Sequence, residues 1–393
     1  MSAPSLEGAP VVCVGFADWD AELRTNQHHL MTRVSARTPV LFVESLGLRR
    51  PTASARDVRR MARRLRRGLR PLRRTGSVAV LSPLVVPLHG SRVLRRVNAF
   101  LLRRTVTRAM RTLGFDRPTL WAYVPHAAQL IEPLRPRFVV YHCVDNIGAH
   151  DRIDSASFDE AESALVSKAD LVIASSEPIR DRLRAVRPDV ELMPNVADTE
   201  LFSTALTTAP RDPALEALPR PRVVFVGAVD AIKIDLDLLG ELADLRPDWS
   251  FVLVGPVGIG DPDTDVSALA ARPNVHLVGA RPQPQLPAVL AAADVGIIPY
   301  RINDLTSGIF PMKVYEYLSA GLPTIATPLP SLHGTEDIVV AADAASTSAA
   351  IADAIADDSD ERRRGRSSRA ARHSWEERMQ ELQRAMGERT WRP

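Results

Sequence analysis

Two charged residues at helical spacing stand out in the stretch GIFPMKVYEYLSAGLPTIATPLPSL. Lys313 and Glu316 lie three positions apart, so a helix would place both side chains on one face. The loop before them, 301–310, follows an apolar run, and Pro311 and Gly321 suit the first turn and the end of a helix. A lysine can neutralise a diphosphate, and a carboxylate can accept both hydroxyls of a ribose. The pair therefore indicates a nucleotide diphosphate site; an ordinary surface salt bridge is the alternative interpretation.

Apolar runs of strand length recur along the chain, each followed by turn residues and a helical pattern. They are Val11–Phe16, Val40–Glu44, Val78–Leu81, Leu120–Val124, Val139–Val144, Leu171–Ser175, Val223–Val226, Phe251–Val254, Val275–Val278, Val295–Pro299 and Thr324–Thr327. Most are continuous rather than alternating, which is typical of strands buried on both faces of a parallel sheet. The pattern predicts an α/β protein with two doubly wound Rossmann-like domains in tandem. Ligands of such domains bind beyond the carboxyl ends of the strands, where the 301–310 loop lies.

The domain boundaries follow from the breaks in this pattern. We expect the first domain over residues 1–205 and the second over 223–369, joined by a proline-rich linker over 206–222 that has no clear period. A helix over about 370–393 should pack back on the first domain. The apolar positions at helix spacing in this last stretch are Trp375, Met379, Leu382 and Met386.

The composition excludes several classes of protein. Apolar residues make up 45% and charged residues 25% of the 393 residues, and the net charge of +3 is not that of a nucleic-acid-binding polycation. Cys13 and Cys143 lie in apolar runs, which suggests buried, reduced thiols in a cytoplasmic protein. No apolar run has the length of a membrane span, and the N-terminus lacks a signal-peptide pattern. The arginine, alanine and proline bias is of an actinobacterial type.

The segment Arg49–Arg74 is strongly basic, with twelve arginines and one acid, Asp57. Val58, Leu65 and other apolar residues occur among the arginines at helix spacing. A basic amphipathic helix is typical of peripheral contact with an anionic membrane, here at its inner face, or with a phosphorylated acceptor. A solvated basic face is the alternative. Nucleic acid is the weakest interpretation, because no aromatic residues are interleaved with the charges.

Three segments of the second half resemble a known family. They are FVGAVDAIKIDLDLLGELADLRPDWSFVLVGP, NVHLVGARPQPQLPAVLAAADVGIIPY and FPMKVYEYLSAGLPTIATPLPSL. In order and spacing they resemble the C-terminal domain of GT-B glycosyltransferases of the family-four type, most of all the TuaH-like branch associated with teichuronic acid and polysaccharide synthesis. Three first-half segments match more loosely: WDAELRTNQHHLMTRVSARTPVLFVESLG, VVYHCVDN and the stretch from ADLVIASSEPIRDRL to ELMPNVADTELF.

The resemblance implies a fold and a reaction. In the GT-B fold two Rossmann-like domains with parallel sheets face each other across a cleft. The implied reaction transfers a sugar from a nucleotide-diphosphate sugar, UDP- or GDP-linked, to a sugar, lipid-linked or small natural-product acceptor. The family generally needs no metal and no separate cofactor, and it retains the anomeric configuration. A non-catalytic GT-B scaffold and a nucleotide-sugar epimerase on the same fold stay open as alternatives.

The same resemblance implies roles for residues around the opening motif. Glu316 corresponds to the glutamate that binds the donor ribose. Lys313 lies where a basic residue faces the donor phosphates or sugar. Ser307, Gly308 and Ile309 correspond to the loop whose backbone N–H groups cradle the diphosphate and touch the sugar.

Five further positions are implied on the donor side. Gly227 follows the first strand of the second domain, and Lys233 matches the lysine of that region. Arg281 and Pro282 lie where the family holds the base through backbone contacts. Gly15, at the end of the first strand of the chain, resembles a glycine loop near the β-phosphate.

Two departures from the family pattern bear on the donor. The family pairs Glu316 with a second glutamate eight positions earlier, and here that position is Gly308. An arginine expected after Gly227 is also absent, since Ala228 and Val229 follow the glycine. The donor sugar and the stereochemical outcome are therefore left open.

The candidate catalytic and acceptor residues come from the first domain. Asp145 ends a strand and could activate an acceptor hydroxyl, or it could cap the next helix. His126, after the run LWAYV, is the alternative catalytic group. Asn26 and His28 could face the acceptor. The stretch Asp235–Asp237 has a metal-motif pattern, but a helix cap is the better interpretation there; His142 and Cys143 are expected to be structural.

Overall fold

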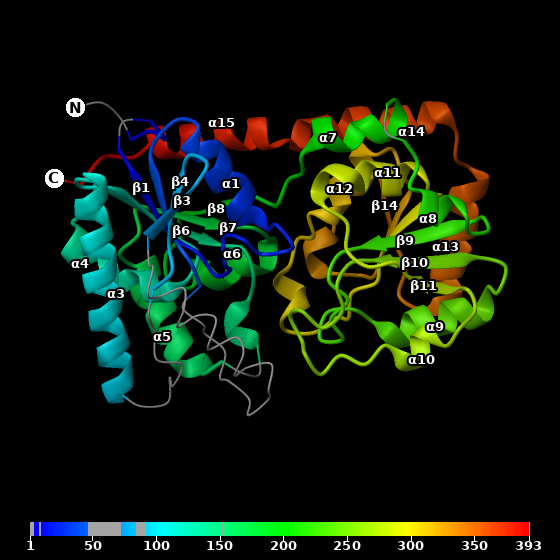
Figure 1. Cartoon of the computed structure of the whole chain (residues 1–393), viewed down its shortest axis with the longest axis horizontal. Helices are drawn as coiled ribbons and strands as arrows, with labels where there is room; N and C mark the ends of the chain where they lie inside the picture. Colours follow the sequence, from blue (N-terminus) through cyan, green and yellow to red (C-terminus); the bar gives the residue numbers. More distant parts are fainter. Residues whose placement is uncertain are drawn as a thin grey trace. The chain divides into compact units, whose positions relative to one another are not determined.

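The computed structural model describes residues 4–7, 9–45, 72–83, 92–150, 153–208 and 210–392 (Figure 1). The chain forms two compact units. The first comprises Met1–Pro194 together with Gln380–Pro393, and the second comprises Asn195–Met379. Of the expected basic segment, only residues 72–74 lie within the described part of the chain.

The first unit is built on an eight-stranded sheet with the order β3-β4-β2-β1-β5-β6-β7-β8. Its strands are β1 (Val11–Val14), β2 (Val40–Val43), β3 (Leu72–Thr75), β4 (Val78–Leu81), β5 (Thr119–Ala122), β6 (Phe138–Cys143), β7 (Leu171–Ala174) and β8 (Val190–Leu192). All neighbours pair in parallel except β3, which is antiparallel to β4. The central strands are buried along their whole length, because helices cover both faces.

Helices connect these strands. They are α1 (Asn26–Ser35), α3 (Arg92–Leu113), α4 (Ile131–Leu134), α5 (Ser155–Val166) and α6 (Glu177–Arg184), with the short 3₁₀ helices η1 (Pro125–Leu130) and η2 (Ile147–Ala149). Helix α5 begins at a side-chain cap: the Asp154 carboxylate accepts a hydrogen bond from the Ser157 N–H at 3.4 Å. Ser176 caps α6 in the same way.

The second unit has a six-stranded, all-parallel sheet with the order β11-β10-β9-β12-β13-β14. Its strands are β9 (Arg222–Val226), β10 (Ser250–Val254), β11 (Val275–Leu277), β12 (Val295–Ile298), β13 (Thr324–Ala326) and β14 (Ile338–Val340). Its helices of four or more residues are α7 (Thr199–Ser203), α8 (Pro213–Glu216), α9 (Leu236–Leu245), α10 (Ser267–Ala270), α11 (Leu286–Ala291), α12 (Lys313–Ser319), α13 (Ala344–Ala356) and α14 (Asp360–Ala370). The strand order reverses between β9 and β12. A crevice for ligands forms at such a switch point, beyond the carboxyl ends of the strands.

Each of the eleven apolar runs overlaps a strand, so the α/β class with parallel sheets is confirmed. The sequence pattern missed β3, β8 and β14. All three are edge strands of three or four residues. Charged residues interrupt β3 and β8, whereas β14 is apolar but only three residues long and mostly exposed. The expected basic helix is wrong at its end: Leu72, Arg73 and Arg74 form β3, which turns back through Gly76 to pair with β4.

The proline-rich stretch 206–222 is packed into the second unit. Leu215 on α8 is fully buried in the core of that unit. The Asp212 carboxylate accepts hydrogen bonds from the N–H groups of Ala214 and Leu215 at 2.9 and 3.3 Å and so caps α8. Proline limits the choice of backbone angles here without preventing tertiary packing.

The charged C-terminal stretch forms two helices, α14 and α15 (Trp375–Gly387), separated by a short 3₁₀ turn, Ala371–His373. The four apolar positions expected at helix spacing are all buried. The end of the chain contacts the first unit: Arg389 pairs with Glu191 at 2.9 Å, and Arg392 pairs with Asp170 at 2.7 Å. Among the helices in the described ranges, none combines the length and the apolar character that crossing a membrane requires.

Candidate functional site

The switch point of the second sheet brings three predicted residues together. Gly227 directly follows β9, and Tyr300 follows β12, the neighbouring strand. Helix α12 comes next along the chain and carries both Lys313 and Glu316 in its first turn. The loop after β12 thus delivers α12 to the end of β9.

Gly227 lies directly against the Lys313 side chain. A Cβ at position 227 would lie 2.5 Å from the Lys313 Cε and 2.7 Å from its Nζ. The backbone of Gly227 has a φ of +145°, which side-chain-bearing residues rarely adopt. Glycine is therefore needed twice here, once for the backbone angle and once to leave room for the ammonium group.

The surroundings of Lys313 keep its ammonium group charged. Burial opposes the charge, but the Tyr300 hydroxyl and the Glu316 carboxylate outweigh burial, so the pKa of Lys313 is raised. The ammonium also lies 5.5 Å from the centre of the Phe225 ring, a cation–π contact. A fixed positive charge at the end of β9 is what a diphosphate requires.

Glu316 lies three residues further along α12 and is also half-buried. Burial raises the pKa of its carboxyl group, and Lys313 partly offsets that shift. Because both side chains are half-buried at the carboxyl end of the sheet, the surface salt bridge proposed as the alternative does not describe this pair.

The loop after β12 is held rigidly by its own polar groups. The Asn303 Nδ2 donates to the carbonyl of Ile232 at 2.9 Å, and the Arg301 N–H donates to the carbonyl of Lys233 at 2.8 Å. Both bonds tie this loop to the one that follows β9. Fully buried Thr306 completes the turn, since its N–H donates to the Asn303 Oδ1 at 2.9 Å.

Backbone N–H groups of the 307–309 turn donate hydrogen bonds to carbonyls of the same loop. The Ser307 N–H donates to the carbonyl of Asn303, and the Ile309 N–H donates to that of Thr306, both at 2.9 Å. Ile309 and Gly308 are buried, and the Ile309 side chain packs in the core of the second unit. In this conformation the N–H groups of Ser307 and Ile309 already donate to the carbonyls of Asn303 and Thr306, so cradling a diphosphate would require the turn to rearrange.

The loop after β9 carries Lys233 to the same edge of the sheet. Its anchor is Asp230, a buried residue whose carboxylate accepts from the Gly260 N–H at 2.9 Å and the Asp261 N–H at 3.2 Å. The Asp230 carbonyl accepts from the Lys233 N–H at 2.8 Å. The Lys233 side chain is half-exposed, so it is accessible to a ligand at this edge.

Arg281 serves the structure of the second unit. Its Nε donates to Asp212 at 3.0 Å, and its Nη1 donates to the carbonyl of Val278 at 2.9 Å. These contacts fix the turn that leads to exposed Pro282 and the 3₁₀ helix after it. The guanidinium therefore positions the backbone at 281–282, through which a base would be held.

The metal-motif pattern at Asp235–Asp237 has a structural explanation. Asp235 caps α9, accepting from the Leu238 N–H at 3.1 Å, and Asp237 pairs with Arg301 at 2.8 Å. The helix-cap interpretation of Asp235 is confirmed.

Replacing Gly227 by alanine should weaken nucleotide-diphosphate binding by about 10- to 100-fold, the effect of losing one hydrogen bond to a charged group. The new Cβ would displace the Lys313 ammonium, which is the flexible end of its side chain. Isothermal titration calorimetry with the cognate nucleotide measures the loss. In a Lys313→Met background the same change should add little, because the ammonium is already gone.

Gly334→Ala is the matched control for the Gly227 change. Gly334 also has a positive φ, +73°, but a Cβ there meets nothing within 4 Å. It should reproduce the backbone strain without the loss of affinity. Equal affinity losses in the two variants would contradict the role given to Gly227.

Three residues predicted to take part in the site, Gly15, His126 and Asp145, lie at the carboxyl edge of the first sheet. Gly15 follows β1, His126 lies in η1 after β5, and Asp145 follows β6 by two residues. The three strands are adjacent and parallel, so their ends meet at one edge. A T-shaped contact between Phe16 and Tyr123, with ring centroids 6.0 Å apart, links the loops after β1 and β5.

These residues have different surroundings. A Cβ at Gly15 would overlap with the Phe42 ring and the Gln27 amide, so glycine is required there for packing against β2 and α1. Asp145 is half-buried, and the cap of the next α-helix is supplied by Asp154 instead. The capping role considered for Asp145 is therefore filled by another residue.

Asn26 and His28 are both buried on the first turn of α1. The His28 Nδ1 accepts from the Thr25 N–H at 3.0 Å, and its Nε2 donates to the carbonyl of Asp18 at 2.9 Å. The Asn26 Oδ1 accepts from the Tyr123 hydroxyl at 3.1 Å. With both ring nitrogens bonded to backbone, His28 holds the loop before α1, and an acceptor-facing role is not what its geometry suggests.

Acid should destabilise the fold between about pH 6.5 and pH 4. Burial lowers the pKa of His28, and burial with Arg372 and Arg378 lowers that of His373 to about 4. An unfolded histidine titrates near 6.5, so in this window the unfolded chain binds more protons and stability falls as the pH falls. Above pH 7 these groups should contribute no pH dependence. Thermal unfolding across the window checks this.

A pair of variants tests whether a buried histidine causes this loss of stability in acid. His373→Gln should flatten the pH dependence of Tm in that window, whereas the same change at exposed His333 should not. An unchanged slope in both variants would show that other groups dominate.

The two cysteines are free and buried, as expected. Burial, together with Glu162, raises the pKa of Cys143 to about 12, so the thiol is protonated and unreactive at neutral pH. His142 lies beside it on β6, stacked against Tyr123 with ring centroids 5.0 Å apart.

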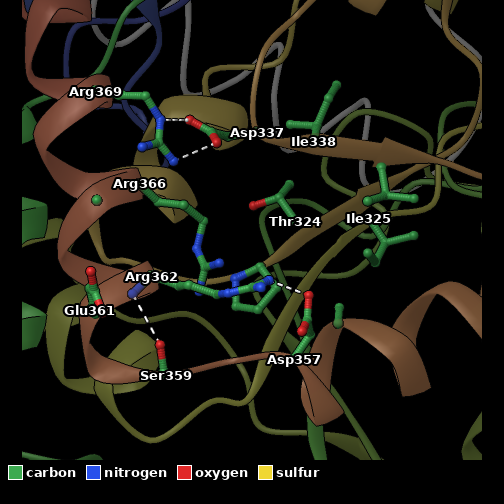
Figure 2. A pocket seen from close by; sticks show the side chains of 14 residues that line it. Thr324, Ile325, Asp337, Ile338, Asp357, Ser359, Glu361, Arg362, Arg366 and Arg369 are labelled. Atoms are coloured by element: carbon green, nitrogen blue, oxygen red, sulfur yellow. Dashed lines mark hydrogen bonds and ion pairs between the residues drawn. The ribbon is translucent and has the colours of Figure 1, made fainter.

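A pocket of about 700 Å³ lies at the opposite edge of the second sheet, where β13 and β14 begin (Figure 2). Arg369 on α14 forms a two-bonded ion pair with Asp337, at 2.6 and 2.7 Å, and Arg362 faces Asp357. This pocket is not the candidate site. It lies at the amino ends of the strands, and its Arg362 and Arg369 are paired with carboxylates.

Sequence reasoning missed the residues that position Lys313. Tyr300 was visible as the last residue of the run ADVGIIPY, and the rule that ligands bind beyond strand ends could have identified it. Tyr317, whose hydroxyl accepts from the Val226 N–H at 2.8 Å, joins α12 to the end of β9. Its role gives no signal in the sequence, because it depends on a contact between distant segments.

Three comparisons identify proteins that are similar to this chain. Residues 220–357 match the family described as "Glycosyl transferases group 1". A protein of Bacillus subtilis strain 168, named as the teichuronic acid biosynthesis glycosyltransferase TuaH, is 32% identical over 175 residues; the match covers 44% of this chain and 43% of TuaH, less than half of its length.

Two solved structures share the fold over nearly the full chain. HepE of Anabaena in complex with UDP-glucose has a TM-score of 0.67 at 15% identity, covering 97% of this chain and 99% of that one. A UDP-forming α,α-trehalose-phosphate synthase of Burkholderia xenovorans in complex with glucose-6-phosphate has a TM-score of 0.70 at 13% identity, covering 96% and 100%. Residues 220–357 are thus similar to the group 1 glycosyltransferases, and the chain as a whole shares its fold with these two solved structures.

Proposed function

We propose that this protein transfers a sugar from a nucleotide-diphosphate sugar to an acceptor hydroxyl. The observation that carries the proposal is the Lys313 ammonium, fixed against Gly227 at the switch point and followed three residues later by Glu316. Lys313 would neutralise the diphosphate that leaves, and Glu316 would accept the ribose hydroxyls. The half-exposed Lys233 at the same edge would add a second positive charge.

UDP is the nucleotide we favour over GDP. The names of the two similar structures mention UDP-glucose and a UDP-forming reaction, which supports a UDP-sugar here. The base would lie along the backbone at 281–282, which Arg281 holds. With Gly308 in place of the family's second glutamate, recognition of the donor sugar would depend on other groups.

We further propose transfer with retention of the anomeric configuration and without a metal or a separate cofactor. The bond from the anomeric carbon to the diphosphate breaks, a bond to the acceptor oxygen forms, and Asp145 or the leaving diphosphate takes the acceptor proton. His126 is the alternative group for this step. The acceptor would be a sugar, a lipid-linked intermediate or a small natural product, as in polysaccharide synthesis.

The cellular setting is part of the proposal. We expect a cytoplasmic enzyme, peripheral at the inner face of the membrane, with Arg49–Arg74 in contact with anionic lipid. That segment lies outside the described residues except for 72–74. Neither of the other functions, a non-catalytic scaffold or an epimerase, has an observation in its favour.

A thermal-shift screen with UDP, GDP, ADP and TDP tests the donor. A ligand that binds the native state raises Tm, so UDP should give the largest shift. Release of free sugar from UDP-sugars, detected by product analysis, then tests for catalysis. A protein that binds UDP but neither hydrolyses nor transfers would be a scaffold, and one that interconverts sugars without an acceptor would be an epimerase.

A further inference from the structure

Helix α3 runs along one side of the first unit (Figure 1). The residues that it exposes have an unusual composition. Five exposed residues between positions 96 and 104 form its outer face: Arg96, Val97, Phe100, Arg103 and Arg104. At 100° per residue they fall within one sector centred on Phe100. We call this set the α3 outer face.

The opposite side of α3 fixes this orientation. Leu102, Val106, Ala109 and Met110 are buried and belong to the hydrophobic core of the first unit. The helix cannot rotate the outer face inward without exposing this core. The outer face is therefore a permanent surface feature of the fold.

All the charged residues of α3 are positive. Its 22 residues include seven arginines and no aspartate, glutamate or lysine. Among the described residues, the exposed arginines of the outer face form no ion pair. Helix α14 is a contrast within the same chain, because its Arg363 and Arg366 both pair with Asp358, and its Arg369 pairs with Asp337.

Two exposed apolar residues lie among the arginines of the α3 outer face. Phe100 is 61% exposed and Val97 is 40% exposed, one helical turn apart. In the described part of the chain, Phe100 is the only aromatic among the exposed large hydrophobic residues. Apolar side chains set among basic ones on a helix are typical of helices that bind at a membrane interface.

We propose that the α3 outer face docks on an anionic lipid surface, with Phe100 and Val97 inserted between headgroups and the arginines on the phosphates. A membrane interface matches both components, since basic residues meet anionic headgroups and an apolar pair enters the acyl boundary. A nucleic acid would use the arginines but offers no apolar layer to Val97. The surface contains no residue of Arg49–Arg74 and none of the donor site, so the inference does not rest on the proposed sugar transfer.

Co-sedimentation of the full chain with vesicles tests the proposal. Wild-type protein should sediment with phosphatidylglycerol-containing vesicles at low salt, less at high salt, and not with pure phosphatidylcholine. Each arginine near the surface contributes roughly fivefold to partitioning, so Arg96→Ser, Arg103→Ser and Arg104→Ser together should lower it roughly 100-fold. Val97→Ser with Phe100→Ser should also lower it.

The fluorescence of a Phe100→Trp variant tests directly whether the side chain at position 100 inserts into the membrane. After subtraction of the wild-type spectrum, its added fluorescence should shift to the blue with anionic vesicles and be quenched by brominated lipid. Leu245→Ser with Arg364→Ser is the matched control, because Leu245 is 50% exposed and Arg364 is exposed, both in the second unit. The control should sediment like wild type, and unchanged Tm values would show that all variants fold.

Several results would overturn the proposal. Wild-type partitioning of the triple arginine variant would do so, as would equal binding to neutral vesicles or the absence of a spectral shift at position 100. A loss of binding only when Arg63, Arg64, Arg66 and Arg67 become serine would assign the membrane contact to that segment instead. Salt-sensitive binding of RNA without vesicle binding would make nucleic acid the partner.

Discussion

Replacing Asp145 by asparagine should lower the turnover of sugar transfer by about 10²–10⁴-fold, the usual contribution of a general base. Asp145 follows β6 at the carboxyl edge of the first sheet, is half-buried, and is not the cap of the next α-helix. Asparagine keeps the shape of the side chain and removes its ability to accept a proton. Nucleotide affinity should stay unchanged, because the donor residues belong to the other unit.

The measurement is steady-state transfer to the acceptor, with nucleotide affinity determined by calorimetry on the same variant. Asp159→Asn, an exposed position on α5, is the matched control and should retain full turnover. A turnover within threefold of wild type for Asp145→Asn would remove Asp145 from the mechanism. His126→Gln would then be expected to carry the large loss, since His126 lies at the same edge.

Replacing Glu316 by alanine should weaken binding of the cognate nucleotide by roughly 5- to 150-fold. The removed carboxylate would leave two desolvated ribose hydroxyls without an acceptor, at about 1–3 kcal/mol. We expect this to be the largest affinity loss from any single change in the second unit. Glu241→Ala, an exposed glutamate on α9, serves as the control and should bind like wild type.

A deoxynucleotide separates the ribose contact from an indirect effect through Lys313. The wild type should bind UDP more tightly than 2′-deoxy-UDP, and in Glu316→Ala the two affinities should become equal. If the preference for UDP survives in the variant, Glu316 does not bind the ribose, and its effect on affinity arises from Lys313 instead.

The sequence by itself determined the strands that form the two sheets. Continuous apolar runs such as Val223–Val226 predict buried parallel strands, because they are of strand length and turn residues flank them. It also determined that Lys313 and Glu316 share a helix, since Pro311 and Gly321 bound that helix in the sequence. The sequence did not reveal edge strands such as β8, because Glu191 interrupts the apolar pattern of that strand.

Only the tertiary structure decided what surrounds each candidate. Lys313 stays charged because Tyr300 and Glu316 act on it beside Gly227, 86 residues earlier in the chain. His28 turned out to have both ring nitrogens bonded to nearby backbone, at Thr25 and Asp18. Spacing along a chain predicts which residues share an element, whereas burial and hydrogen-bond partners depend on where the elements pack. The role of each lysine, glutamate or histidine is therefore decided by its neighbours in the folded chain.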